Sequence, residues 1–316
     1  MDSISDPLQT RWKRLQAKID NLWGDRRQPR WRNSRFLVGF CASLVTVLLL
    51  TTTAWAYTVT VSPAAPRLGD TISVRMQPQQ GTTEPPTVTM NGITYPSFPM
   101  PNGDFRAMVP TSPLDTPGGY MLQITGAEGA QTLAVELGDR NFNTQWITLP
   151  PGQTSLGTDH EFARVAAFKS IVTPDKFWNG PLLRPSQGRV SSAYGNRRYY
   201  NGDFAEGYYH RGVDYAAANG SPLVAPAAGH IRLVGRVADG FELHGNTIGI
   251  DHGQGVLSIM IHLSRIDVQE GDFVQAGQVI GAIGSTGAST GPHLHWGLYV
   301  NGVAVDPVPW RFDGVE

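Results

Sequence analysis

The sequence predicts a mainly β protein that also carries one transmembrane helix near its N-terminus. Three observations lead to this prediction. Glycine (36 residues) and proline (23 residues) are abundant in a chain of 316 residues, which indicates many turns. Short runs of β-branched and aromatic residues recur between those turns from residue 57 onward. Residues 36–57, by contrast, contain no charged side chain and are long enough for a membrane-spanning helix.

The uncharged segment 36–57 is expected to be a membrane anchor. As a helix it would span about 33 Å, close to the bilayer hydrocarbon thickness of about 30 Å. The basic arm of residues 1–35 holds nine Lys and Arg against four Asp, so the positive-inside rule keeps this arm in the cytoplasm. Trp55 and Tyr57 then mark the outer aromatic belt. We therefore expect a single-pass protein of the plasma (inner) membrane, with its C-terminal domains on the periplasmic or extracytoplasmic side.

A cleavable signal peptide is the alternative for this segment, because Ala54-Trp55-Ala56 fits a cleavage motif. Cleavage would make the remainder a secreted protein, but the basic arm is long for a signal peptide, which favours the uncleaved anchor. The formal net charge of −1 argues against nucleic acid as a partner. The single cysteine, Cys41, excludes an intrachain disulfide and any multi-cysteine metal site. No feature of the sequence identifies a protein partner.

Residues 58–150 are expected to form an accessory domain with an immunoglobulin-like β-sandwich fold, without the usual cysteine pair. Asn91-Gly92 and Gly118-Gly119 are interpreted as hairpin turns. The predicted strands of this region share alternating polarity and β-branched residues, and they cover residues 57–61, 71–76, 87–90, 105–109, 120–124 and 132–137.

Residues 151–185 are expected to form a helix and a linker. Thr158 and Glu161 have the spacing of a capping box, and apolar residues follow at helical spacing to about Val172. The prolines that follow indicate an extended segment leading to a second domain over residues 186–316. In that domain short β-strand patterns separated by turns continue to the C-terminus.

Seven of the eight histidines lie between residues 210 and 295 of this second domain. His210 and Asp214 place an imidazole and a carboxylate four residues apart, with Gly212 allowing the backbone to bend between them. His293 and His295 alternate in a predicted strand, so both should lie on the same face. Each pattern alone is a weak signal, but two histidines and one carboxylate with an open fourth position make a catalytic zinc set.

Seven motifs follow one another along the second domain: Tyr194–Arg198, His210–Asp214, Pro226–Ile231, Ile250–Gly253, His262–Ser264, Glu270–Gly281 and Gly284–His295. In this order they resemble the lysostaphin/LytM-type zinc endopeptidases, over about residues 186–310. The resemblance implies an antiparallel β peptidase domain with a zinc groove, which hydrolyses peptide bonds in bacterial peptidoglycan stem peptides or cross-links. It also implies one Zn²⁺ per chain, with His210, Asp214 and His295 as ligands and His262 and His293 as the non-ligating catalytic pair.

One departure from the family pattern is Met260, which stands where an aromatic residue is common and which we expect to pack or line the groove. His230, His244 and His252 match no ligand position and are expected to be structural or exposed. The Glu270–Gly281 stretch resembles half of a biotinyl or lipoyl domain, but no acceptor lysine follows Lys176. The alternative function is a catalytically silent wall-binding or regulatory scaffold that activates another cell-wall hydrolase; the complete ligand set favours the enzyme.

Overall fold

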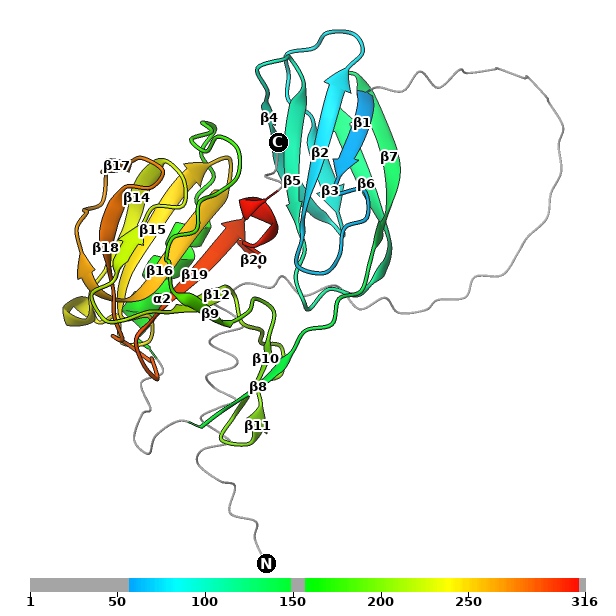
Figure 1. Ribbon diagram of the computed structural model, residues 1–316. Coiled ribbons are helices and arrows are strands. Elements are labelled where there is room, and N and C mark those ends of the chain that lie inside the picture. Colours follow the sequence, from blue (N-terminus) through cyan, green and yellow to red (C-terminus); the bar gives the residue numbers. More distant parts are fainter. Residues whose placement is uncertain (1–56, 149–156, 313–316) are drawn as a thin grey trace, which may run out of the picture.

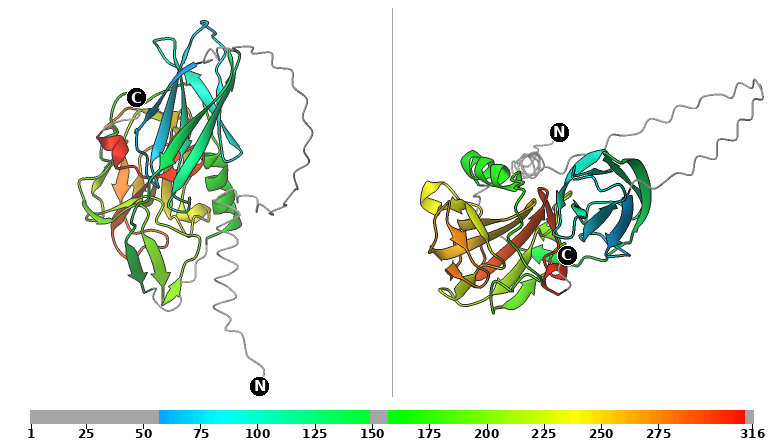
Figure 2. Two further views of the ribbon diagram at one scale, coloured as in Figure 1. Left: turned by 90° about the vertical axis from the view of Figure 1, so that its right-hand side faces the viewer. Right: turned by 90° about the horizontal axis from the view of Figure 1, so that it is seen from above.

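The computed structural model describes residues 57–148 and 157–312, which form two β bodies (Figure 1). The first body is one continuous antiparallel sheet with the strand order β1-β2-β5-β4-β3-β6-β7, curled around its own core (Figure 2). Its strands are β1 (Tyr57–Ser62), β2 (Thr71–Pro78), β3 (Thr87–Met90), β4 (Ile93–Pro99), β5 (Phe105–Pro110), β6 (Gly118–Gly126) and β7 (Gly129–Leu137).

The strands of the first body fall into two halves, β1-β2-β5 and β3-β6-β7, which share β4. β4 pairs with β3 through its first residues and with β5 through Ser97–Pro99, so it links the two halves. The immunoglobulin-like arrangement therefore stays a prediction. The Asn91-Gly92 turn is confirmed between β3 and β4, where both residues have positive φ. The prediction of a turn at Gly118-Gly119 is wrong, because this pair begins β6. The chain reverses instead between Gly126 and Gly129, where β6 leads into β7.

Tyr57 lies at the start of β1 and is buried in the core of the first body, not in an aromatic belt at a membrane surface. The remainder of the expected anchor, residues 36–56, lies outside the described residues. Within residues 57–148 and 157–312, none of the helices has the length and apolar character needed to cross a membrane.

The second body is built mainly from β-strands, as predicted, and neighbouring strands of its large sheet pair antiparallel. The main strand order is β17-β14-β15-β16-β19-β12-β9; β18 pairs with β13 and β16, and β20 pairs with β19. The strands are β9 (Arg189–Ser192), β12 (Val213–Ala216), β13 (Pro222–Val224), β14 (Gly229–Gly235), β15 (Asn246–Gly253), β16 (Val256–Ile266), β17 (Phe273–Val274), β18 (Val279–Ile283), β19 (His293–Val300) and β20 (Val303–Val305), with short 3-10 helices at Val237–Asp239 and Pro309–Arg311.

Helix α2 (Asp159–Lys169) packs on the second body beside β14. Its capping box is confirmed: the Thr158 hydroxyl accepts from the Glu161 N–H, and the Glu161 carboxylate accepts from the Thr158 N–H. The helix ends at Lys169, earlier than the expected Val172. Phe168 packs where Gly249 of β15 has no side chain, since a Cβ there would come within 2.8 Å of its ring.

Strand β8 (Thr144–Ile147) follows the first body, but it pairs with the second. It runs parallel to β10 (Arg197–Tyr200), which forms a hairpin with β11 (Asp203–Phe204). We expected residues up to 150 to belong to the accessory domain. The structure instead places β8 in a small three-stranded sheet with β10 and β11 (Figure 1).

The two bodies are docked through buried polar contacts. Arg106 of β5 is buried, and its Nη2 donates to Gln254 Oε1 at 2.9 Å. Trp310 Nε1 donates to Thr71 Oγ1 at 3.2 Å. Buried polar groups are stabilising only when they are paired, so these contacts fix how the bodies meet.

Candidate metal centre

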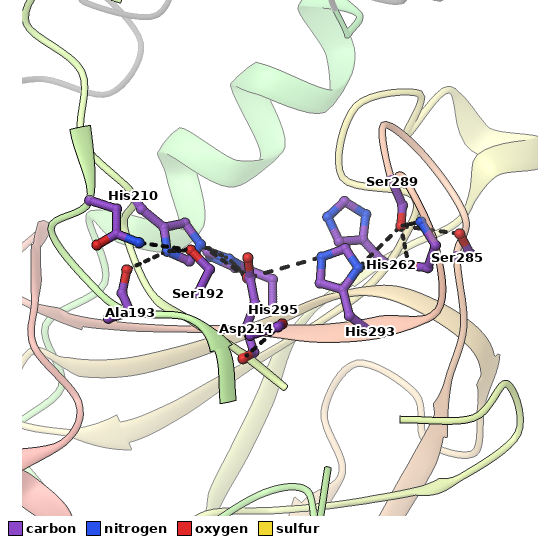
Figure 3. A network of polar contacts seen from close by, with 12 residues as sticks. Ser192, Ala193, His210, Asp214, His262, Ser285, Ser289, His293 and His295 are labelled. Carbon is purple, nitrogen blue, oxygen red and sulfur yellow. Dashed lines mark hydrogen bonds and ion pairs between the residues drawn. The ribbon is translucent and has the colours of Figure 1, made fainter. Parts of the chain in front are cut away.

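The structure brings His210, Asp214 and His295 together, with one potential ligand atom from each residue within 4.8 Å of the others (Figure 3). Asp214 lies on β12 directly opposite His295 on β19. His210 precedes β12 and reaches the same point from the adjoining loop. The sheet register therefore fixes two members of the group, and the short His210–Asp214 spacing fixes the third.

Gly212 is needed at this site for space. A Cβ at Gly212 would come within 2.3 Å of the Trp296 carbonyl oxygen and within 2.8 Å of the His295 ring. The sequence led us to expect that Gly212 supplies backbone freedom. The structure gives a different reason: its missing side chain lets the His210 loop approach β19.

The hydrogen bonds of His210 leave its inner ring nitrogen without a proton. Nδ1 lies 2.7 Å from the Ala193 carbonyl oxygen, which can only accept, so Nδ1 donates and Nε2 is bare. Nε2 nevertheless lies 3.0 Å from Asp214 Oδ1, which is another acceptor. Two acceptors at this distance are stabilised by a cation between them, and two imidazole nitrogens with one carboxylate oxygen are a donor set that suits zinc. The residues present therefore fit a zinc ion.

The charges at the site are consistent with this donor set. Burial alone would raise the pKa of Asp214, but His210 and His295 outweigh it and hold that pKa well below 3.8, so the carboxylate is ionised. Burial, assisted by the Arg198 guanidinium, lowers the pKa of His210 to about 4. Burial also lowers the pKa of His295. Neutral imidazoles and an ionised carboxylate are the forms that bind a metal ion.

Three polar side chains lie around His210, Asp214 and His295, and we did not predict from the sequence that they belong to this site: Ser192, Gln145 and Arg198. Ser192 Oγ lies 3.1 Å from His210 Nδ1 and 2.9 Å from Gln145 Oε1 of β8. Arg198 Nη2 lies 3.5 Å from Asp214 Oδ2. Such partners orient metal-binding side chains. Arg198 lies in the motif Tyr194–Arg198, which was a signal for it, whereas Gln145 comes from a distant segment that no local pattern could connect to the site.

His262 and His293 lie beside each other at the edge of this group, with ring centroids 4.8 Å apart (Figure 3). His262 Nδ1 lies 2.9 Å from the Thr286 carbonyl oxygen, and His293 Nδ1 lies 2.8 Å from the Gly291 carbonyl oxygen. Each Nδ1 therefore donates, and each Nε2 is left as an acceptor. His293 Nε2 is 4.0 Å from Asp214 Oδ1, so this pair borders the candidate metal position.

The remaining histidines of the second body lie outside this group. His252 is buried and bonded through Nδ1 to the Ala228 carbonyl oxygen, and His244 is buried against Glu161. His230 packs edge-on against Phe273. Met260 is fully buried in the core, so it packs the sheet and does not line a groove.

Comparison with known proteins connects the site to a family. Residues 208–307 match the model of peptidase family M23, which confirms the resemblance that the motifs indicated. The DD-carboxypeptidase/endopeptidase Mpg of Neisseria meningitidis is 46% identical over 99 residues, which cover 31% of this chain and 22% of that protein. The peptidoglycan DD-endopeptidase ShyC of Vibrio cholerae is 37% identical over 121 residues, covering 38% of this chain and 26% of that protein.

The chain thus spans about a quarter of the length of these curated relatives. A solved structure described as a peptidase M23 of Pseudomonas aeruginosa matches more widely, with a TM-score of 0.60 and 29% identity. That likeness covers 78% of this chain and 94% of the other, so it extends well beyond residues 208–307.

Proposed function

We propose that this chain, in which residues 208–307 form a domain of peptidase family M23, is a zinc-dependent endopeptidase that hydrolyses peptide bonds in bacterial peptidoglycan stem peptides or cross-links. In this proposal His210, Asp214 and His295 hold one Zn²⁺, and His262 and His293 are the catalytic residues. The observation that carries it is the convergence of the three ligand atoms within 4.8 Å, beside two histidines that present bare ring nitrogens.

The chemistry that zinc supplies in such a site is Lewis-acid polarisation of a carbonyl group and activation of water. The two histidines handle the protons. His293 Nε2 is an acceptor and can take the proton of the attacking water, then pass it to the leaving amine. His262 would donate to the oxyanion. Since its Nδ1 proton is committed to Thr286, His262 can donate from Nε2 only after that nitrogen has accepted a proton.

Membrane attachment is the second part of the proposal. The uncharged segment that ends before Tyr57, the first residue of β1, and the basic arm ahead of it support a single-pass anchor, with both β bodies outside the cytoplasm, where the substrate lies. The first body, which we interpret as an immunoglobulin-like accessory domain, then serves to hold the peptidase domain at its distance from the membrane. Protease treatment of intact spheroplasts should degrade both bodies and spare the N-terminal arm.

The experiment that tests the activity is digestion of purified sacculi with the full-length protein in detergent, followed by mass spectrometry of the released fragments. We expect new peptide ends that depend on zinc and disappear with a chelator. Zinc measured by elemental analysis should reach one ion per chain. A zinc-free native protein that releases nothing would favour the alternative, a silent scaffold that activates another hydrolase.

A further inference from the structure

We propose that Glu161 of helix α2 is a positioning residue that acts through His244 to hold His262 in its working orientation. Glu161 lies outside the segment 208–307 that matches the peptidase family, so helix α2 supplies this residue to the peptidase domain from another part of the chain. The inference rests on the proposed function, because it assigns His262 a role in that reaction.

The Glu161 carboxylate is fully buried and is the fixed point of this arrangement. Its Oε1 accepts from both the backbone N–H and the ring Nδ1–H of His244, each at 2.6 Å. Its Oε2 accepts from the backbone N–H groups of Leu243 at 3.1 Å and Thr158 at 3.3 Å. Burial alone would raise the pKa of Glu161, but the hydrogen bonds from His244 outweigh it and lower that pKa below 4.5. The carboxylate is thus ionised and clamps the loop before β15.

The clamped loop holds the backbone of His262. The His244 carbonyl oxygen accepts from the His262 N–H at 2.9 Å. At this point β16 contains an irregularity, because the register with β15 shifts between Asn246 and Ile248. His262 itself has a φ of 66°, a left-handed conformation that is strained for a residue other than glycine. A register shift of this kind redirects a side chain. The strained backbone of His262 persists only because contacts with neighbouring residues stabilise it.

The ring of His262 is held by the same loop. Thr286 receives the His262 Nδ1–H on its carbonyl oxygen, and its Oγ1 accepts from the Asn246 N–H at 3.0 Å. Gly245 approaches Thr286 so closely that a Cβ would come within 2.5 Å of its backbone. Leu243 also accepts from the Ala288 N–H at 2.9 Å. Both bonds that orient His262, one to the backbone and one to the ring, therefore depend on the loop that Glu161 clamps.

Loosening this clamp should affect turnover more than substrate binding. In Glu161→Gln the side-chain NH2 would face N–H donors in either orientation of the amide, those of Leu243 and Thr158 in one and that of His244 in the other. The loop should shift, and His262 should lose its fixed orientation. Losing a general acid or base outright costs about 10²- to 10⁴-fold, so misorienting His262 should cost less, and we expect kcat to fall about 10- to 100-fold with KM changed less than about twofold.

The experiment compares Glu161→Gln in two backgrounds of the full-length zinc-loaded protein, wild type and His262→Ala. If Glu161 acts through His262, the substitution should lower kcat in the first background and have no further effect in the second. His244→Leu, a smaller change that removes one of the four hydrogen bonds, should give a weaker effect with the same dependence on His262. Arg164→Gln is the control, since Arg164 lies on the same helix and among the contacts described forms an ion pair with the exposed Glu270, away from His244 and His262.

A second readout does not require activity. In protein labelled with ¹⁵N-histidine, the His262 Nδ1 signal should report a protonated nitrogen in wild type and a mixture of both tautomers in Glu161→Gln. An equal fall of kcat in both backgrounds, with the His262 signal unchanged, would show a merely structural role and overturn the proposal. If the wild-type protein cleaves no peptidoglycan, the proposed function fails, and the nitrogen signal alone decides whether Glu161 positions His262.

Discussion

Asp214 and His295 face each other across β12 and β19, with Asp214 Oδ1 and His295 Nδ1 2.9 Å apart. Both strands lie inside the sheet of the second body, and Val213, Leu294 and Trp296 beside them are buried. The two groups are therefore placed by backbone pairing and by core packing on the far side of the sheet. A site built on strands in this way is positioned more closely than one built on loops.

Replacing Asp214 by Asn should remove zinc from the protein with little loss of folded structure. Asn keeps the size of the side chain but lacks the negative charge with which Asp214 would bind the zinc ion. Mutation of a residue that only orients a metal ligand typically lowers metal affinity about 10- to 100-fold. Loss of a ligand itself should therefore lower the zinc affinity more than about 100-fold. Elemental analysis and competition with a zinc chelator measure this. Asp267→Asn is the matched control, because Asp267 pairs with Arg265 away from the site.

Replacing His293 by Ala should leave zinc bound and lower kcat by about 10²- to 10⁴-fold, the range for a lost general base. The reason is that His293 borders the candidate metal position but contributes no ligand atom to the three-residue group. Zinc content and sacculus digestion are measured on the same preparation. His230→Ala, a histidine substitution on β14 outside the site, should retain both zinc and turnover. A His293→Ala protein without zinc would place His293 among the ligands.

The features of the site that could be predicted from the sequence are local. His293 and His295 share a face because a strand repeats every two residues, and His210 and Asp214 meet because they are four residues apart. In the fold, the Asn91-Gly92 turn was also predictable from local sequence, because these two residues readily adopt the positive φ of a tight hairpin. Gly118-Gly119 misled because a glycine pair also fits within a strand, and β6 continues through it to pair with β7.

The features that could not be predicted depend on contacts between distant segments. Gln145 reaches the site only because β8 pairs with β10, although the two segments are some fifty positions apart. Glu161 shows no more in the sequence than a capping-box residue, and its hydrogen bonds to His244 arise from helix packing. The left-handed backbone of His262 likewise has no glycine or asparagine to indicate it.

Replacing Gly212 by Ala should damage the metal centre without changing a polar atom. The new Cβ would meet the Trp296 carbonyl oxygen, which the sheet holds in place, and the His295 ring. Overpacking of this kind typically lowers the free energy of unfolding by about 1–3 kcal/mol. Displacement of the His295 ring should relieve part of the steric clash. We expect a lower unfolding temperature together with weaker zinc binding. Gly119→Ala is the control, since the nearest atom to its Cβ is Glu136 Oε2 at 3.5 Å; equal losses in the two variants would contradict this explanation.

Lowering the pH should destabilise the folded protein through His252, which is fully buried at a distance from the metal-binding residues. Burial lowers the pKa of His252 from 6.5 to about 4. Between these values the unfolded chain binds a proton that the folded chain does not, so stability falls as the pH decreases from 6.5 and levels off below about 4. The difference between the two pKa values corresponds to about 3 kcal/mol at most.

The measurement is chemical unfolding of the chelator-treated protein at a series of pH values, since zinc binding has its own pH dependence. Other buried histidines contribute to the same slope, and only the difference between wild type and His252→Gln isolates His252. That difference should narrow as the pH falls from 6.5 to 4, because the variant has no proton to gain at this position. His160→Gln, at an exposed position on α2, should follow the wild-type curve throughout. Parallel curves for wild type and His252→Gln across this range would show that the buried imidazole already carries its proton or titrates as it does in the unfolded chain.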